Sequence, residues 1–511
     1  MARLALLSVS DKMGILELAK QLVDNFAFEI VSSGGTAKSL KEAGIPVTLV
    51  SEHTGAPEIL GGRVKTLHPR IHGGILGRRN HPEDLKEMAQ QNIPPFDLVV
   101  VNLYPFEQTV ANPDISLSDA IEKIDIGGPT LLRAAAKNFA HLTVLCDPIY
   151  YQLYLEQLSQ GEPTVEFRKS MALATFRKTQ SYDWAIANYF AQLPTEKTTG
   201  TWQIGGKLNQ TLRYGENPHQ GASWYSTGDV PSGWSAALQL QGKELSYNNL
   251  LDLEAARRLI IEFPTQQAAV AILKHTNPCG VALGNSLSQA YLKAFNGDPV
   301  SAFGGIVALN QSVDEETAIA LSKTFLECIV APGCSDQAKE ILAKKNNLRV
   351  LVLKDFVSGC KEHLEMISGG FLVQSVDDIA TDSKQWKVVT TRQPSAEQME
   401  ELLFAWKIVK HVKSNAIVIT KDLTSRGIGA GQMNRVGSAT IALEQAKEHA
   451  HGGVLASDGF FPFDDSVRLA AQAGISAIVQ PGGSVRDIES IEAANELGMV
   501  MLFTDIRHFL H

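Results

Sequence analysis

Short apolar runs alternate with amphipathic stretches at the beginning of the chain, and this alternation restricts the possible fold more than any other feature of the sequence. Apolar residues predict strands over 4–9, 28–31 and 45–50. Apolar residues recur at helical spacing from Ile15 to Val23 and predict a helix between the first two strands. Strands that alternate with helices form parallel sheets covered on both faces. The sequence therefore predicts a doubly wound α/β domain at this end.

A polar segment divides the chain into two predicted domains. A length of 511 residues exceeds what one hydrophobic core organises. Residues 194–201 are polar and small, with one proline and one glycine, as expected of a linker. The predicted first domain, 1–193, has a core sheet over about 1–147 followed by helices, and the second domain is predicted over 202–511.

Composition favours a cytoplasmic protein that does not bind nucleic acid. The formal net charge is −9, so no overall basic field attracts a phosphate backbone. The odd number of cysteines and the absence of a C-x-x-C pair favour a reducing cytosol. No signal peptide is expected, and no apolar stretch approaches the roughly 20 residues that span a bilayer. The five cysteines are Cys146, Cys279, Cys328, Cys334 and Cys360.

A lysine and a histidine follow an apolar run in the middle of the chain. Residues 268–273 predict a buried strand, and residues 276–280 (TNPCG) predict a turn. Lys274 and His275 would then lie at the strand end, where α/β proteins place ligands. A neighbouring ammonium disfavours imidazolium, so we expect a neutral His275 that can accept a proton. A surface Lys–His pair is the alternative.

Two glycine-containing segments of the first domain are candidates for binding anions. Residues 32–36 (SSGGT) stand between a strand and a helix, whose first N–H groups are free and whose dipole attracts anions. This sequence is neither G-x-G-x-x-G nor Walker A, so it does not imply a dinucleotide or a triphosphate. Residues 61–74 place basic residues between two glycine pairs. A capped turn and a solvated loop are the alternatives.

The second domain contains an internal repeat. Two pairs of segments resemble each other. An apolar run ends in Lys274 and another ends in Lys421, and each is followed by a glycine pair, Gly304-Gly305 after the first and Gly452-Gly453 after the second. The separations are 304 − 274 = 30 and 452 − 421 = 31. We interpret this as a duplicated α/β unit. If the two copies face each other, a pocket is expected between them.

Residues 457–465 (SDGFFPFDD) combine three phenylalanines with carboxylates. Exposed aromatic rings beside acids suit a flat, nitrogen-rich heterocycle, because the rings stack and the acids accept hydrogen bonds. The alternative is that the phenylalanines anchor the loop in the core.

A zinc site is not expected. Pro278-Cys279 has the dipeptide found in zinc deaminases, but those enzymes need H-x-E before a P-C-x-x-C segment. Cys279 has no cysteine three residues later, His363-Leu364-Glu365 follows it, and His81-Pro82-Glu83 lies across the predicted linker. No serine or cysteine nucleophile signature is found.

Taken together and in this order, the motifs resemble the bifunctional purine-biosynthesis family that combines AICAR formyltransferase with IMP cyclohydrolase. The motifs are SVSDK, SSGGTA, GGRVKTLHP, NLYPF, IDIGG, RAAAKN, LRYGENPHQ, KHTNPCG, GAGQ and DGFFPF. The resemblance implies a methylglyoxal-synthase-like first domain and a second domain of duplicated cytidine-deaminase-like units. It also implies a homodimer with shared transferase sites and 10-formyltetrahydrofolate as formyl donor.

The resemblance assigns roles to individual positions. It implies the catalytic residues His275, Lys274, Lys65, Tyr104, Asp125 and Lys137. It implies that the cyclohydrolase substrate is bound by Ser10, Lys12, Ser33, Gly34, Gly35, Thr36, Arg63, Thr66, Asn102 and Ile126. AICAR would be held by Arg213, Tyr214, Gly304, Glu327, Asn415 and Arg435, and the folate by Phe460, Asp465, Gly482, Gly483 and Arg507. A regulatory nucleotide-binding protein, a zinc-dependent deaminase and a different one-carbon donor remain as rival interpretations.

Overall fold

The protein is described by a computed structural model that covers residues 3–112, 114–191, 202, 204–227 and 231–511. The chain divides into two compact units, one of Met1–Gly205 with Gly228–Val230 and the other of Gly206–Thr227 with Pro231–His511. The predicted linker, 194–201, lies outside the described residues. The two units are therefore described separately.

The first unit contains a five-stranded parallel sheet in the order β3-β2-β1-β4-β5. This confirms the parallel α/β arrangement that the sequence predicts. The strands are β1 Arg3–Val9, β2 Phe28–Ser32, β3 Thr48–Leu49, β4 Leu98–Asn102 and β5 Thr143–Leu145. The strand predicted over 45–50 is wrong in extent. Pro46 has no N–H group to donate to a neighbouring strand. The Leu49 N–H donates to the Glu52 side chain at 2.9 Å, and this hydrogen bond caps helix α3, which begins at Val50.

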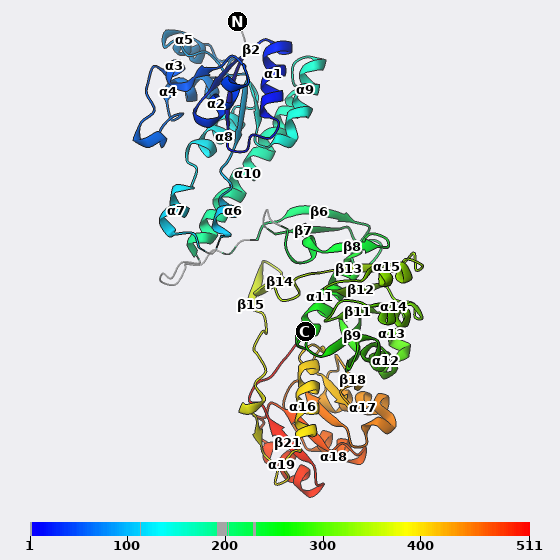
Figure 1. Cartoon of the computed structure of the whole chain (residues 1–511). Helices are drawn as coiled ribbons and strands as arrows, with labels where there is room; N and C mark the ends of the chain where they lie inside the picture. The colour runs from blue at the N-terminus through cyan, green and yellow to red at the C-terminus, as the bar shows by residue number, and fades with distance from the viewer. Residues whose placement is uncertain (1–2, 113, 192–201, 203, 228–230) are drawn as a thin grey trace. The chain divides into compact units, whose positions relative to one another are not determined.

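Helices flank this sheet (Figure 1). Residues Leu4–Leu7 of β1 and Leu98–Val101 of β4 are buried, as expected of central parallel strands. The helices are α1 Ile15–Phe26, α2 Gly34–Glu42, α3 Val50–Thr54, α4 Pro69–Leu76, α5 Pro82–Gln90, α6 Phe106–Val110, α7 Leu117–Glu122, α8 Gly127–Lys137, α9 Tyr151–Gln160 and α10 Val165–Ala191.

The second unit contains two six-stranded sheets with the same topology, which confirms the repeat. Their orders are β10-β9-β11-β12-β13-β8 and β18-β17-β19-β20-β21-β16, and corresponding neighbours pair in the same directions. The first sheet consists of β8 Leu238–Gln241, β9 Ala268–Lys274, β10 Asn277–Gly284, β11 Ile306–Leu309, β12 Cys328–Ala331 and β13 Arg349–Val352. The second consists of β16 Lys387–Val388, β17 Ile417–Thr420, β18 Ser425–Gly429, β19 Val454–Ser457, β20 Ala477–Gln480 and β21 Val500–Phe503.

The helices of this unit repeat in the same way, and two small hairpins stand outside the repeat. Helices α11 Tyr247–Ile260, α12 Leu287–Gly297, α14 Glu315–Ser322 and α15 Asp336–Leu342 correspond to α16 Ala396–Val409, α17 Arg435–Ala446, α18 Asp465–Gln472 and α19 Asp487–Glu496. A short helix, α13 Pro299–Ala302, has no named α-helical counterpart among the described residues. The hairpins are β6 Lys207–Leu212 with β7 Ala222–Ser226, and β14 Glu362–Ile367 with β15 Gly370–Ser375.

The turn predicted over 276–280 is wrong in extent. It comprises only His275 and Thr276, whose φ angles are 52° and 63°, and β10 begins at Asn277. Two-residue turns with both φ angles positive match the twist of a hairpin. Pro278 is tolerated within β10 because this is an edge strand with an irregular register between Pro278 and Gly280.

A buried ionic cluster joins the helices of the two repeats. Glu262, just after α11, contacts the Lys410 Nζ at 3.0 Å and the His411 Nε2 at 3.1 Å, just after α16. Burial alone would raise the pKa of Glu262, but hydrogen bonds and charge from His411 and Lys410 lower it to about 2. This cluster therefore stabilises the packing of one repeat on the other.

We expect Glu262→Gln to lower the free energy of unfolding by about 3 kcal/mol, because it leaves a buried cation without its counter-charge. The pKa of Glu262 is lowered on folding, so its contribution is present above its ordinary value of 4.5 and is lost as the pH falls toward 2. Urea unfolding followed by tryptophan fluorescence checks both points. Equal stability of the two proteins at pH 7 would contradict the prediction.

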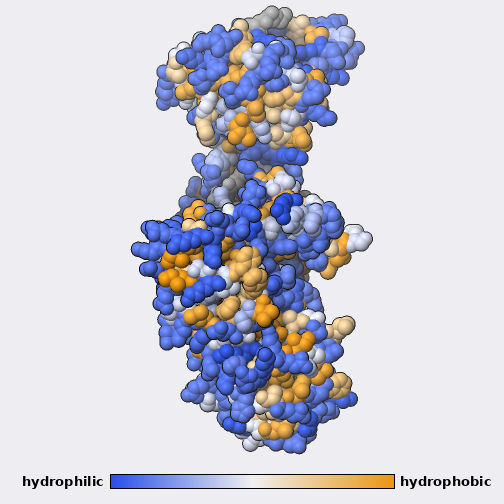
Figure 2. Space-filling model, turned by 90° about the vertical axis from the view of Figure 1, so that its right-hand side faces the viewer, coloured by the Kyte–Doolittle hydropathy of each residue, from blue (hydrophilic) through white to orange (hydrophobic). Residues whose placement is uncertain are grey.

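In the part of the chain that the structure describes, no helix is long and apolar enough to cross a membrane. Hydrophilic residues predominate on the face shown in Figure 2, with hydrophobic residues in scattered groups.

Candidate active sites

In the first unit, predicted site residues meet at the carboxyl edge of the sheet. The side chain of Asn102, at the end of β4, accepts hydrogen bonds from the N–H groups of Ser10 at 2.5 Å and Asp11 at 3.0 Å. Its amide nitrogen donates to the Asp11 carbonyl at 2.9 Å. Asn102 therefore fixes the loop after β1, which carries Ser10 and Lys12.

Lys12 and Thr36 converge on the end of β1. The Thr36 hydroxyl accepts from the Val9 N–H at 3.0 Å, and the Lys12 ammonium donates to that hydroxyl at 3.1 Å and to the Val9 carbonyl. Burial lowers the pKa of Lys12, while nearby Asp11 opposes the shift. The structure thus places a partly desolvated cation beside the first turn of α2.

The SSGGT segment turns into α2 as predicted, and Lys65 lies beside it. Ser33 is the N-cap residue and Gly34 has a φ of 51°. A Cβ on Gly34 would lie 3.2 Å from the Lys65 Nζ, and a Cβ on Gly62 would lie 2.7 Å from the Lys65 Cε. The Lys65 Nζ also contacts the Glu58 carboxylate at 3.2 Å. This arrangement brings a second cation to the free N–H groups of a helix N-terminus.

Asp125 is held at the start of α8. Its carboxylate accepts the Gly128 N–H at 2.8 Å, and its own N–H donates to the Tyr182 hydroxyl at 2.8 Å. Burial raises the pKa of Asp125, and a further hydrogen bond from the Tyr104 backbone opposes that shift. Thr66 is close as well, since a Cβ on Gly127 would lie 3.2 Å from its hydroxyl oxygen. Asp125, Tyr104 and Thr66 thus share one neighbourhood.

Other predicted residues of the first unit are not joined to these contacts. Lys137 is the last residue of α8, about 14 Å along the helix axis from Gly128. Arg63 forms an exposed pair with Glu122 at 3.2 Å. The Ile126 side chain is 60% exposed, so it is accessible at the surface. The roles of Lys137, Arg63 and Ile126 therefore remain predictions.

In the second unit, the hairpin turn after β9 leaves His275 exposed, and Lys274 before it is half-buried. The Lys274 Nζ donates to the Phe303 carbonyl at 2.8 Å, immediately before Gly304. The Gly304 N–H in turn donates to the Phe325 carbonyl at 2.8 Å, close to Glu327. The hairpin and these loops before β11 and β12 therefore form one edge.

Glu327, Arg213 and Tyr214, which are also predicted to hold AICAR, each contact another side chain of the protein. Glu327 accepts from the Arg349 guanidinium at 3.0 Å. Arg213 donates to the Tyr214 hydroxyl at 2.7 Å, and its guanidinium lies over the tyrosine ring. Arg213 is exposed and contacts only its chain neighbour in these pairs, whereas Glu327 is held by a residue 22 positions later in the chain.

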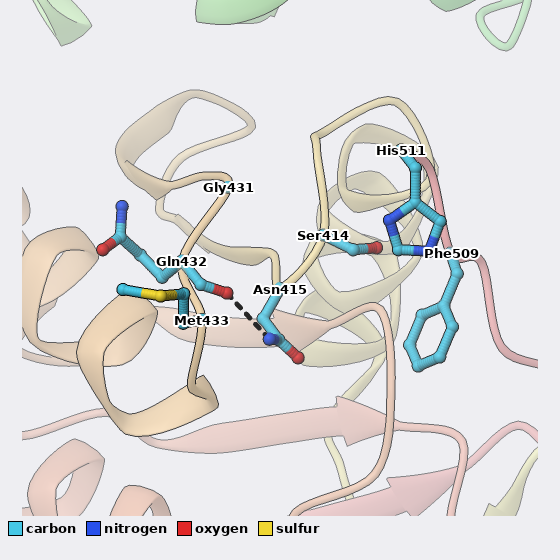
Figure 3. Close-up of a pocket in the computed structure, with 7 residues that line it drawn as sticks. All are labelled: Ser414, Asn415, Gly431, Gln432, Met433, Phe509 and His511. Atoms are coloured by element: carbon cyan, nitrogen blue, oxygen red, sulfur yellow. Dashed lines mark hydrogen bonds between the residues drawn. The ribbon is translucent and has the colours of Figure 1, made fainter.

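A pocket opens in the second repeat, beside Lys413, which contacts the hairpin. The Asn277 side-chain oxygen accepts the Lys413 N–H at 3.1 Å and thereby joins the two repeats. Beside it, the Asn415 side chain donates to the Gln432 carbonyl at 2.8 Å (Figure 3). The pocket is lined by Ser414, Asn415, Gly431, Gln432, Met433, Phe509 and His511. All of these residues belong to the second repeat, so this pocket does not lie between the two copies, where the sequence analysis expects one.

Arg435 is buried at the start of α17 and orients Asn415. Its guanidinium pairs with Asp458, donates to the Ser457 hydroxyl at 2.9 Å and donates to the Asn415 side-chain oxygen at 2.7 Å. Asp458 is fully buried and also accepts from Ser414 and from the Ala416 N–H. Sequence reasoning missed Asp458 as a central acceptor.

The phenylalanine loop has two exposed rings and one anchor. Phe460 and Phe463 are exposed, but Phe461 is fully buried in the core of the second repeat, so the prediction of three exposed rings was wrong. One side of this loop faces the core, and a ring on that side must be buried. A Cβ on Gly459 would lie 2.5 Å from the Arg435 guanidinium and 2.7 Å from the Phe509 ring.

The other predicted folate-binding residues lie near the same edge of the second sheet. Arg507 has its guanidinium 4.7 Å from the Phe509 ring centre, and Phe509 lines the pocket. Gly482 and Gly483 follow β20, and the Gly483 N–H donates to Asp487 at 2.7 Å. Asp465 begins α18 and accepts the Ser466 N–H at 2.6 Å.

Among the described residues, no group of three or more His, Cys, Asp and Glu side chains is arranged to hold a metal ion. All five cysteines are free. Burial raises the pKa of Cys279 to about 12, so its thiol stays protonated at neutral pH.

Comparison with known proteins identifies the family. The family model described as "AICARFT/IMPCHase bienzyme" matches residues 135–445, and the "MGS-like domain" model matches residues 14–130. The chain is 66% identical to a protein of Rippkaea orientalis, 64% to one of Gloeothece citriformis and 65% to one of Microcystis aeruginosa, each over the whole of both chains. All three are named "Bifunctional purine biosynthesis protein PurH". The chain belongs to the AICARFT/IMPCHase bienzyme family and has an MGS-like domain in its N-terminal part.

Proposed function

We propose that the two activities of this bifunctional enzyme, AICAR formyltransferase and IMP cyclohydrolase, reside in separate units of the chain. These activities are the last two steps of IMP synthesis. Formyl transfer is assigned to the second unit and ring closure to the first. The observation that supports the assignment is the division of the chain into two compact units, because the predicted residues divide in the same way. Lys274, His275 and Asn415 belong to one unit, and Lys65, Thr36 and Asp125 belong to the other.

In the second unit, His275 acts as the general base for formyl transfer. The 5-amino group of AICAR is a weak nucleophile, because the adjacent carboxamide withdraws its electrons. As its nitrogen forms a bond to the formyl carbon, His275 accepts a proton, and the bond from that carbon to the folate nitrogen breaks. The folate nitrogen then takes up a proton. Lys274 either stabilises the developing oxyanion or supports that final protonation.

The substrates of this step are held around the pocket. AICAR is bound by Asn415, oriented by Arg435, together with Arg213, Tyr214, Gly304 and Glu327. The formyl donor of this folate-dependent step is 10-formyltetrahydrofolate. Phe460, Asp465, Gly482, Gly483 and Arg507 bind this donor, and Phe460 supplies an exposed ring for stacking.

In the first unit, formyl-AICAR closes to IMP. Its carboxamide nitrogen attacks the formyl carbon, an oxyanion forms, and water is lost. The reaction is intramolecular, so positioning supplies much of the acceleration. The phosphate of the substrate binds at the N-terminus of α2, with Lys12 and Lys65 nearby, and Lys65, Tyr104, Asp125 and Lys137 carry the chemistry.

The enzyme acts as a homodimer in the cytoplasm. Support for a second copy comes from the β14–β15 hairpin, which exposes apolar residues: Met366 is 69% exposed, Leu372 58% and Ile367 49%. An exposed apolar hairpin favours contact with another chain. The free thiols support a reducing compartment.

Product identification tests the proposed donor and both steps. The purified protein is mixed with AICAR and 10-formyltetrahydrofolate that carries ¹³C in its formyl group, and the purine product is identified by mass. We expect IMP containing one labelled carbon. IMP without label would exclude this donor, and formyl-AICAR without IMP would contradict the assignment of ring closure to this chain.

A further inference from the structure

We propose that Asp252 is a positioning residue for formyl transfer, because it holds the turn that presents His275. Asp252 lies on α11, and its carboxylate accepts the N–H of Thr276 at 2.6 Å. The His275 backbone also hydrogen-bonds to this carboxyl. Both donors thus belong to the two residues that form the turn. This inference rests on the proposed role of His275.

The turn needs such an acceptor. His275 and Thr276 both adopt left-handed conformations, with φ angles of 52° and 63°. This region is unfavourable for residues other than glycine, and especially for a β-branched residue such as Thr276. Hydrogen bonds from outside the hairpin compensate for that cost. A carboxylate is a strong acceptor for backbone N–H groups, so its removal would allow the turn to relax.

The second repeat contains the same arrangement without a histidine. Glu401 is the sixth residue of α16, as Asp252 is the sixth residue of α11. Its carboxylate accepts the Leu423 N–H at 2.9 Å, at the second position of the turn Asp422-Leu423, whose φ angles are 59° and 51°. The link between helix and turn is therefore a feature of the repeat.

The lysine before each turn is held in a matching way. Lys274 donates to the carbonyl of Phe303, before Gly304, and Lys421 donates to the carbonyl of His451, before Gly452, at 2.9 Å. Both halves thus hold their hairpin from two sides. Only the first half places an imidazole on the turn, because Asp422 stands at the position of His275. The hydrogen bond from the helix carboxylate to the turn therefore positions an imidazole in the first repeat but not in the second.

Packing reinforces the assignment. Burial raises the pKa of Asp252 and of Glu401, as expected for carboxyls enclosed between a helix and its hairpin. His275 itself is exposed, so its orientation depends on the backbone of the turn rather than on surrounding side chains. Asp252 therefore controls where the imidazole lies relative to bound AICAR.

Steady-state formyl transfer distinguishes this role from a merely structural one. We expect Asp252→Ala to lower kcat about 10- to 100-fold with a smaller change in KM for AICAR, because an acceptor of the turn is lost. Asp252→Asn keeps one acceptor oxygen and is expected to restore most of kcat. Glu401→Ala removes the matching hydrogen bond from the other repeat and is expected to retain kcat.

Each outcome decides the question. Equal loss of kcat in Asp252→Ala and Glu401→Ala, or failure of Asp252→Asn to restore it, would overturn the inference. His275→Ala is measured alongside, and its retention of transfer would instead refute the proposed function. If Asp252→Ala does not fold, Asp252→Glu replaces it. Glutamate moves the carboxylate by one methylene, so a lowered kcat is expected and a wild-type kcat would overturn the proposal.

Discussion

Replacing His275 with alanine is expected to reduce formyl transfer to AICAR by about 10²- to 10⁴-fold, the range that general bases contribute. The amine cannot lose its proton efficiently once the imidazole is absent. His275 is exposed at a hairpin turn, so the replacement removes little packing. Cyclisation of supplied formyl-AICAR should stay near the wild-type rate, because the residues assigned to that step belong to the first unit. Tetrahydrofolate release and IMP formation measure the two steps separately.

The turn itself requires a control, because alanine is less tolerant than asparagine of a left-handed conformation. His275→Asn keeps the turn and removes the base, so we expect the same loss. Asp422→Ala changes the corresponding turn of the second repeat and should leave transfer unaffected. Equal loss of transfer and cyclisation in a folded His275 variant would rule out separate sites.

Replacing Lys65 with alanine should produce the opposite pattern. We expect cyclisation to fall by about 10²- to 10³-fold, as when one stabilising donor is removed from an oxyanion site. Lys65 lies beside Gly34 at the start of α2, so its loss removes a cation from the nucleotide site. Formyl transfer should be retained. The rate of IMP formation from supplied formyl-AICAR measures the effect.

Lys38→Ala provides the matched control for that experiment. Lys38 also carries positive charge on α2, but its side chain is 78% exposed and is 3.8 Å from Glu42. We expect this variant to cyclise at the wild-type rate. If Lys65→Ala also cyclises normally, Lys65 has no part in the mechanism.

Much of the architecture could be predicted from the sequence, because its determinants are local. Apolar runs and helical spacing predict the parallel sheet of the first unit, and the spacing from Lys274 to Gly304 predicts the repeat. The SSGGT segment could be identified as a strand-to-helix turn, because glycine and N-capping serine favour such a turn. The shortened β3 shows the limit, since a capping bond from Glu52 decides where that strand ends.

The side chains that orient the sites could not be predicted, because their partners are distant in sequence. Asp458 meets Ser414 and Arg435 only after β17 and β19 pair. Asp252 bonds to a turn 24 residues away, and a single aspartate on a helix gives no sign of this. The burial of Phe461 depends on which side of its loop faces the core. In each case tertiary packing, rather than local pattern, determines the contact.

Mixing the two variants tests the central claim that the activities occupy separate sites. Neither His275→Ala nor Lys65→Ala alone should form IMP from AICAR and 10-formyltetrahydrofolate at an appreciable rate. The equimolar mixture should form it, because one chain makes formyl-AICAR and the other closes its ring. Persistent formyl-AICAR without IMP in the mixture, or rapid IMP formation by either variant alone, would contradict the account.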